Sequence, residues 1–208
     1  MDTIAILGAG NVGRALASRL VSAGAKVRFG VREPKAARAQ GGPGVPLLAP
    51  QAAAADAGMI FLAVPAAAAV EAARSAGNLH GKVLIDCTNP VRWDSGPVWA
   101  PPPQGSVSQG LAAALPGVAV VKGFNHFGAE IQANPGYDSG PADALFAGDD
   151  AGAKRRVMEM AARMGFRPHD AGPLRNAALL ENLAVLWIHL ATSGGKGRQL
   201  AFRLEQRP

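Results

Sequence analysis

The sequence predicts an α/β protein built on a doubly wound parallel sheet. Two observations lead to this prediction. Short apolar runs rich in Ile, Val and Leu alternate with helical stretches along most of the 208 residues, as strands buried on both faces of a parallel sheet do. In addition, a glycine-rich turn joins the first apolar run to the first helical stretch. This alternation is typical of α/β domains, in which each helix crosses over the sheet.

The first strand is predicted over residues 3–7, and a glycine motif follows it. The motif has Gly-x-Gly-x-x-Gly spacing and consists of Gly8, Ala9, Gly10, Asn11, Val12 and Gly13. A helix up to Gly24 and a second strand from Lys26 complete the fingerprint of a Rossmann dinucleotide-binding site. Gly8 makes the tight turn, Gly10 lets the backbone approach the pyrophosphate, and Gly13 lets the helix pack on the strand. The N-terminus of the helix then presents N–H groups to the phosphates.

The end of the second strand indicates which dinucleotide binds. An NAD site carries Asp or Glu there to bind the ribose hydroxyls, whereas an NADP site lacks that charge and supplies a cation. This chain has Gly30 at that position, followed by Arg32 and Lys35, and Glu33 is expected to face solvent. The sequence therefore predicts NADP(H) as the cofactor.

Further strands are predicted over residues 59–64, 82–87, 118–124 and 144–148. The helices between and after them are predicted over residues 52–57, 66–76, 108–115 and 151–164. Ligands of such sheets lie beyond the carboxyl ends of the strands. The residues expected to line the cofactor site on this ground are Ala63, Val64, Pro65, Asn89 and Pro90.

Two candidate catalytic residues, Asn125 and His126, follow the fifth strand. A histidine at a strand end is either a site residue or a local hydrogen-bonding group, and both interpretations stay open. Residues 91–107 are expected to form a long loop near the same strand ends. Two interpretations of this loop also stay open. It is either a lid, with Trp93 or Trp99 closing over a planar acceptor, or a surface loop held by two aromatic side chains.

The last part of the chain is predicted to be mainly helical. Asp149 or Asp150 is expected to cap the helix over residues 151–164, and Asn176 the last helix, over residues 177–192. The last helix is apolar nearly all round, so we expect it to lie at a subunit interface of a homodimer. The chain is accordingly divided into a Rossmann domain, residues 1–148, and a small C-terminal extension, residues 149–208.

Composition argues against several other classes. The formal net charge is +6, but the basic residues are scattered, so no nucleic-acid partner is expected. The single cysteine, Cys87, provides neither a disulfide framework nor a cysteine-based zinc site, and no metal site is expected. No apolar run reaches transmembrane length and no signal peptide precedes the first strand. We therefore expect a cytoplasmic protein that does not bind a membrane.

The chemistry expected of NADPH is hydride transfer. A carbonyl reductase needs a proton donor, but Tyr137 has no lysine four residues after it. If the acceptor is itself a flavin-like ring, the protein need only orient two rings and exclude water. We therefore predict hydride transfer between NADP(H) and a planar acceptor of flavin, deazaflavin or quinone type. Two alternatives are a reductase of small carbonyls or imines with His126 as proton donor, and a non-catalytic NADP(H)-sensing dimer.

Several motifs resemble the family of deazaflavin (coenzyme F420)-dependent NADP oxidoreductases, a similarity that extends to the NADPH-binding domains of STEAP metalloreductases. They are the glycine motif with Gly30, Val31 and Arg32, the pairs Val64–Pro65 and Asn89–Pro90, residues 121–125, and residues 170–176 with Glu181. The resemblance implies a Rossmann domain with a small C-terminal extension, usually homodimeric, in which the acceptor ring stacks on the nicotinamide. It also implies a flavin or deazaflavin as second substrate.

The resemblance further implies roles for particular residues. The glycine motif would hold the pyrophosphate, Gly30, Arg32 and Lys35 would surround the 2′-phosphate, and Val64, Pro65 and Asn89 would flank the nicotinamide. The archaeal deazaflavin enzymes carry a histidine at the position that matches Asn125, whereas in this chain the histidine is His126.

Overall fold

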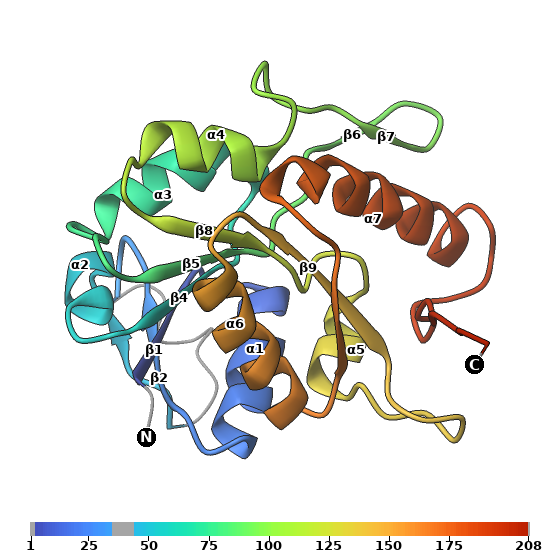
Figure 1. Ribbon diagram of the computed structural model, residues 1–208, viewed down its shortest axis with the longest axis horizontal. Helices are drawn as coiled ribbons and strands as arrows, with labels where there is room; N and C mark the ends of the chain where they lie inside the picture. The colour runs from blue at the N-terminus through green and yellow to red at the C-terminus, as the bar shows by residue number, and fades with distance from the viewer. Residues whose placement is uncertain (1–2, 35–43, 208) are drawn as a thin grey trace.

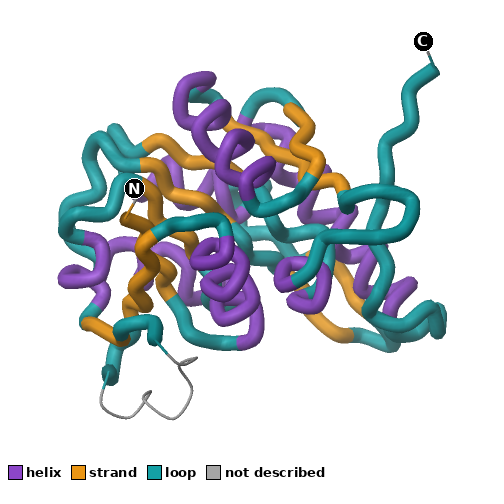
Figure 2. Tube along the Cα trace, turned by 90° about the horizontal axis from the view of Figure 1, so that it is seen from below, coloured by secondary structure: helices purple, strands orange, loops and turns teal. Residues whose placement is uncertain are grey.

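The computed structural model describes residues 3–34 and 44–207. An eight-stranded sheet in the order β10-β9-β8-β5-β4-β1-β2-β3 forms its centre, with helices on both faces (Figures 1 and 2). Its strands are β1 (Thr3–Leu7), β2 (Lys26–Gly30), β3 (Leu47–Leu48), β4 (Met59–Leu62), β5 (Val83–Asp86), β8 (Ala119–Lys122), β9 (Asp143–Gly148) and β10 (Arg167–Asp170). Every pair is parallel except β8 with β9. The predicted α/β fold of Rossmann type is therefore confirmed.

The helices are α1 (Asn11–Ser22), α2 (Pro50–Ala54), α3 (Ala69–Ser75), α4 (Val107–Ala114), α5 (Ala129–Ala133), α6 (Ala151–Arg163) and α7 (Ala177–Ala191). Two single 3-10 turns, η2 (Ala66–Ala68) and η3 (Leu174–Asn176), precede α3 and α7. Two apolar cores lie on the two faces of the sheet, because successive strand residues point to opposite sides. In β1, Ile4 and Ile6 join the core with α1, whereas Ala5 and Leu7 join the core with α2 and α3.

Part of the segment predicted as a long loop forms a hairpin, so the prediction is wrong for its first half. The strands β6 (Val91–Trp93) and β7 (Pro97–Trp99) pair antiparallel as a separate sheet. The hairpin packs against α7 at the carboxyl edge of the main sheet (Figure 1). Its turn has positive φ at Ser95 and Gly96, which a serine–glycine pair after Asp94 accommodates.

The helix caps agree with the sequence in one case and differ in another. Asp150 caps α6 by accepting a hydrogen bond from the N–H of Ala153 at 2.8 Å, as predicted for Asp149 or Asp150. Asn176 does precede α7, but its side chain makes no cap. Its amide donates instead to the carbonyl oxygen of Ala171, across the turn that leads into the helix.

The strand β10 follows residue 148 in sequence and pairs with β9 at the edge of the main sheet. The division of the chain at residue 148 stays a prediction. Within residues 3–34 and 44–207, no helix combines the length and the apolar character that a membrane span requires.

Candidate functional site

The outer glycines of the motif are required by the fold itself. Gly8 has a φ of +104°, and a Cβ there would lie 2.3 Å from the carbonyl oxygen of Ala63. A Cβ on Gly13 would lie 2.1 Å from the carbonyl oxygen of Gly8. Both distances are far inside van der Waals contact, so these two positions bring β1, α1 and the end of β4 together.

The middle glycine is different, because nothing in the fold requires it. Gly10 has an ordinary φ of −74°, and a Cβ there would have no neighbour within 4 Å. The space above Gly10 is open, as the approach of a pyrophosphate to the backbone requires. Gly10 is also the N-cap of α1, and the first turn of α1 contains no acidic residue. The positive end of the helix dipole is therefore left for an anion.

A cavity of about 240 Å³ lies beside this motif. The residues that line it are Leu7, Gly8, Gly30, Val31, Arg32, Pro50, Val64, Pro65, Ala68, Glu71, Ala72 and Ser75. A Cβ on Gly30 would lie 2.6 Å from Cδ2 of Leu7 and 3.1 Å from Cα of Pro50. An Asp or Glu at position 30, as an NAD site carries at the end of β2, therefore does not fit unless α2 shifts.

The cavity offers a cation in place of that carboxylate. Arg32 is exposed at its edge, and no ion pair to Arg32 is found within the described part of the chain. Glu33 is exposed to solvent, in agreement with the expectation from the sequence. Lys35, the second predicted cation, lies outside the described residues. This cavity therefore fits the adenosine half of NADP better than that of NAD.

The strand ends bring Asn89 and Asn125 together. Nδ2 of Asn89 donates to the carbonyl oxygen of Asn125 at 2.7 Å, and Nδ2 of Asn125 donates to Oδ1 of Asn89 at 2.8 Å. Asn125 also donates to the carbonyl oxygen of Leu180 in α7 at 3.0 Å. Its own Oδ1 is buried and has no hydrogen-bond partner among the described residues. The pair thus fixes the half-buried amide of Asn89 as a polar surface beyond β5 and β8.

His126 is not part of this surface. Its ring is buried, with Nε2 3.3 Å from the carbonyl oxygen of Asp143 in β9 and the ring centroid 4.7 Å from that of Phe127. Burial lowers the pKa of His126 to about 4, so the imidazole is neutral near pH 7. This geometry gives no support to His126 as a proton donor for a carbonyl or imine.

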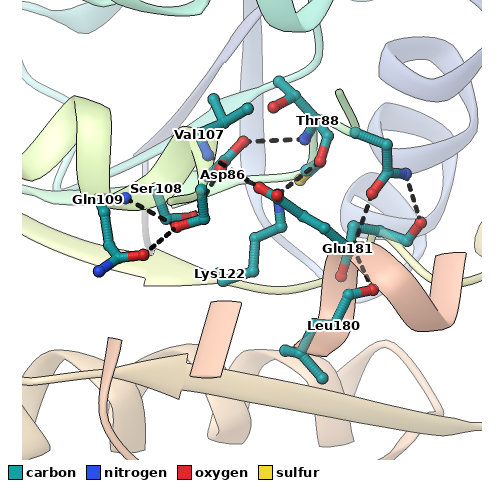
Figure 3. A network of polar contacts seen from close by, with 12 residues as sticks. Asp86, Thr88, Val107, Ser108, Gln109, Lys122, Leu180 and Glu181 are labelled. Atoms are coloured by element: carbon teal, nitrogen blue, oxygen red, sulfur yellow. Dashed lines mark hydrogen bonds and ion pairs between the residues drawn. The ribbon is translucent and has the colours of Figure 1, made fainter. Parts of the chain in front are cut away.

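A buried ionic network lies behind the strand ends, and the sequence did not predict it (Figure 3). Lys122 at the end of β8 has no solvent-exposed side-chain surface, and neither has Asp86 or Glu181. The Lys122 ammonium donates to Asp86 Oδ2 at 3.0 Å, to Glu181 Oε1 at 3.2 Å and to the carbonyl oxygen of Thr88 at 2.5 Å. All the hydrogens of the ammonium group are therefore used.

Each carboxylate of the network accepts two further hydrogen bonds. Asp86 accepts from Oγ of Ser108 at 2.6 Å and from the N–H of Thr88 at 2.9 Å. Glu181 accepts from the N–H of Val107 and from Nε1 of Trp99, both at 2.9 Å. The network thus joins β5, β8, α4, α7 and the β6–β7 hairpin, and each of its three charged groups has three polar partners, the condition under which buried charges are tolerated.

The last helix is buried on one face within this chain and exposed on the other, and its predicted place at a subunit interface stays a prediction. Glu181 belongs to the inward face, with Leu180, Ala184 and Trp187. On the outward face, Leu179 is 65% and Leu186 is 47% exposed.

The described residues contain no group of three or more His, Cys, Asp or Glu side chains that could hold a metal ion. Cys87 is buried, and burial raises the pKa of its thiol, as expected for a packed cysteine.

Comparison with known proteins relates the chain to a group of reductases. Residues 3–90 match the family described as "NADP oxidoreductase coenzyme F420-dependent". The metalloreductase STEAP3 of Rattus norvegicus is 34% identical over 179 residues, which cover 86% of this chain. The chain spans only 35% of the length of that relative.

Solved structures show the same likeness. A candidate F420-dependent NADP-reductase from Arthrobacter sp. FB24 is 31% identical, with a TM-score of 0.84 over 94% of this chain and 96% of its own. A reductive aminase from Aspergillus terreus, solved with NADPH and ethyl levulinate, is 22% identical, with a TM-score of 0.67. It matches over 94% of this chain and 63% of its own length. At this identity the second likeness concerns the fold alone.

Proposed function

The chain belongs to the family of coenzyme F420-dependent NADP oxidoreductases, and from this membership we propose that its second substrate is a planar redox acceptor of the flavin, deazaflavin or quinone type. The prediction of an NADP-dependent oxidoreductase is confirmed by the same relatives. The observation that carries the acceptor proposal is that Asn89, half-buried and held by Asn125 beyond the ends of β5 and β8, presents an amide and not an acid. A planar redox ring accepts hydride without a protein acid, so orientation suffices.

NADPH supplies a hydride from its nicotinamide ring when it is bound. In this proposal, the glycine motif and the N-terminus of α1 bind the pyrophosphate, and Arg32 binds the 2′-phosphate. Ala63, Val64, Pro65, Asn89 and Pro90 line the nicotinamide half. Lys35 remains a predicted contact of the 2′-phosphate. The open space above Gly10 and the steric block at Gly30 support this arrangement.

The two alternative functions receive less support. Reduction of a carbonyl or imine would require a proton donor, and the buried His126 with a pKa of about 4 is poorly suited to that role. The likeness to a reductive aminase concerns the fold and adds no site residue. A non-catalytic sensor is disfavoured because the relatives are reductases.

The proposal is tested by following NADPH oxidation at 340 nm with a panel of acceptors. The panel contains flavin mononucleotide, a deazaflavin, menadione, and a carbonyl and an imine of similar size, each also assayed with NADH. We expect oxidation of NADPH by one or more of the ring acceptors and weaker oxidation of NADH. Activity confined to the carbonyl or the imine would overturn the proposal.

Arg32→Ala is expected to weaken NADPH binding by roughly 10- to 100-fold, the loss typical of a hydrogen bond to a charged group. Binding of NADH should change by less than about twofold, because NADH has no 2′-phosphate. Titration calorimetry with both nucleotides measures the two effects. Arg28→Ala is the matched control, since Arg28 lies in β2, the strand that leads to Arg32, pairs with Asp56 and does not line the cavity. Equal loss of both nucleotides in Arg32→Ala would contradict the NADP assignment.

We also propose that the protein is a homodimer through the outward face of α7, working in the cytoplasm. The exposed Leu179 and Leu186, about two helical turns apart on one face, support this interface, because exposed apolar side chains on one face are common at subunit contacts. Leu186→Glu is expected to convert a dimer into a monomer in sedimentation equilibrium. Val21→Glu, which places the same charge at an exposed apolar position of α1, outside α7, reports the effect of charge alone. A monomer at all concentrations of the unmodified chain would exclude this interface.

A further inference from the structure

A second cavity adjoins the first and has a different chemistry. It has a volume of about 640 Å³ and lies between η2 and α3 on one side and α4 with residues 100–104 on the other. Its lining residues are Pro65, Ala66, Ala67, Val70, Asn89, Pro90, Val91, Ala100, Pro101, Pro102, Gln104, Val107, Gly110 and Ala114. Pro65 lines both cavities, so the second cavity begins where the nucleotide cavity ends.

The lining of the second cavity contains no charged side chain. All of its residues are described, and none of them is Asp, Glu, Lys, Arg or His. Only Asn89 and Gln104 bring side-chain hydrogen-bonding groups. Burying a charged ligand group in such a lining is costly, because no opposite charge compensates the loss of water. An uncharged ring with one or two hydrogen-bond acceptors is compatible with it, and the volume is in the range of small-molecule sites.

The buried network fixes two walls of this cavity. Glu181 accepts the N–H of Val107, a lining residue in α4. Glu181 also accepts Nε1 of Trp99, whose neighbour Ala100 is a lining residue that donates its N–H to the carbonyl oxygen of Pro90 at 2.7 Å. These contacts are all made between residues of the chain, so they hold both walls in place, which lowers the cost of binding.

We propose that this cavity is the acceptor site and that its acceptor is an uncharged quinone-type ring. The inference rests on the proposed function and names one of its three acceptor classes. The overall step is balanced as NADPH + H⁺ + quinone → NADP⁺ + hydroquinone, in which the quinone takes up two electrons and NADPH loses them. Since no acid lines the cavity, the additional proton comes from water. Asn89 lines this cavity and, in the proposed function, also the nicotinamide half, so it lies between the nicotinamide ring and the quinone ring.

Gly110→Leu tests this assignment by filling the cavity. A Cβ on Gly110 would have as its neighbours Gln104 Oε1 at 3.7 Å and Cγ of Pro102 at 4.0 Å, both from lining residues. The Cβ therefore fits, and the rest of the leucine side chain extends toward the cavity. Leucine is also a better helix former than glycine, so α4 is not weakened. Binding of neutral 1,2-naphthoquinone to the protein saturated with NADP⁺ is measured by titration calorimetry.

We expect Gly110→Leu to weaken binding of 1,2-naphthoquinone at least about tenfold and to leave the Kd for NADP⁺ within about twofold. Ala113→Leu is the matched control, because Ala113 is exposed on the same helix and does not line the cavity. Ala114→Phe is a second cavity-filling variant if Gly110→Leu does not fold. A charged analogue, 1,2-naphthoquinone-4-sulfonate, is expected to bind at least about tenfold more weakly than the neutral quinone.

Quinone binding that is unchanged in Gly110→Leu and Ala114→Phe would place the acceptor elsewhere. Equal binding of the sulfonate would overturn the requirement for an uncharged ring. These outcomes are distinguishable from failure of the proposed function. Oxidation of NADPH by none of the ring acceptors would refute the function, whereas turnover with quinone binding insensitive to cavity filling would refute the cavity assignment alone.

Discussion

Lys122→Met is expected to lower the free energy of unfolding by about 3–5 kcal/mol, the range for removing one partner from a buried ion pair. The substitution removes the ammonium that faces both Asp86 and Glu181, and each of these side chains is fully buried. Two carboxylates would remain close together without a cation, a state that folding must avoid or neutralise by protonation. Urea unfolding at pH 7, followed by circular dichroism, measures the loss.

Two further variants make this result specific. Lys82→Met removes a partly exposed lysine that binds the carbonyl oxygens of Ala55 and Ala57, so its cost should be well below that of Lys122→Met. Adding Glu181→Gln to Lys122→Met should restore part of the loss, because one of the unpaired charges disappears. A cost below about 1 kcal/mol for Lys122→Met would show that the network does not hold the fold in the way its contacts indicate.

Gly10→Val is expected to weaken NADPH binding by about 100-fold or more, equivalent to roughly 2.7 kcal/mol. The fold should change little, because a Cβ at position 10 has no neighbour within 4 Å. The loss of a favourable N-cap residue should lower the stability by about 1 kcal/mol at most. Titration calorimetry with NADPH and thermal unfolding of the free protein separate the two effects.

Gly8→Ala provides the contrast within the same motif. A Cβ at Gly8 would collide with the carbonyl oxygen of Ala63 at 2.3 Å, and the φ of +104° disfavours any other residue. This variant should therefore lose stability and nucleotide binding together. Gly10→Val would contradict the assignment if its binding of NADPH stayed near that of the unmodified protein, or if it were lost only in proportion to unfolding.

The nucleotide half of the site could be predicted because its signals are local in sequence. The strand over residues 3–7, the glycine motif and Gly30 lie within one βαβ unit, and the structure agrees with the steric reasons given for Gly8 and Gly13. At Gly30 the sequence indicated only a missing carboxylate, and the structure adds the steric reason. The rule that ligands lie at the carboxyl ends of strands placed Asn89 and Asn125 at strand ends, and the structure shows in addition that they bond to each other.

The buried network behind the strand ends could not be predicted, because it depends on contacts between residues far apart in the chain. Lys122 looks like an ordinary polar end of an apolar strand, and Glu181 like a polar interruption of an apolar helix. Only the fold brings them together across 59 residues. The position of His126 at a strand end was predictable, but its direction was not, because the turn at Phe124, with a φ of +55°, decides where the next side chains point.

The link between Lys122 and Glu181 has a consequence for the order in which the protein matures on the ribosome. Chains fold from the N-terminus as they are synthesised. The βαβ unit with the glycine motif has all of its residues early in translation. Val107 and Trp99 acquire their shared carboxylate only when α7 has left the exit tunnel. The nascent chain therefore contains the whole glycine motif before it contains the carboxylate that joins Trp99 to Val107.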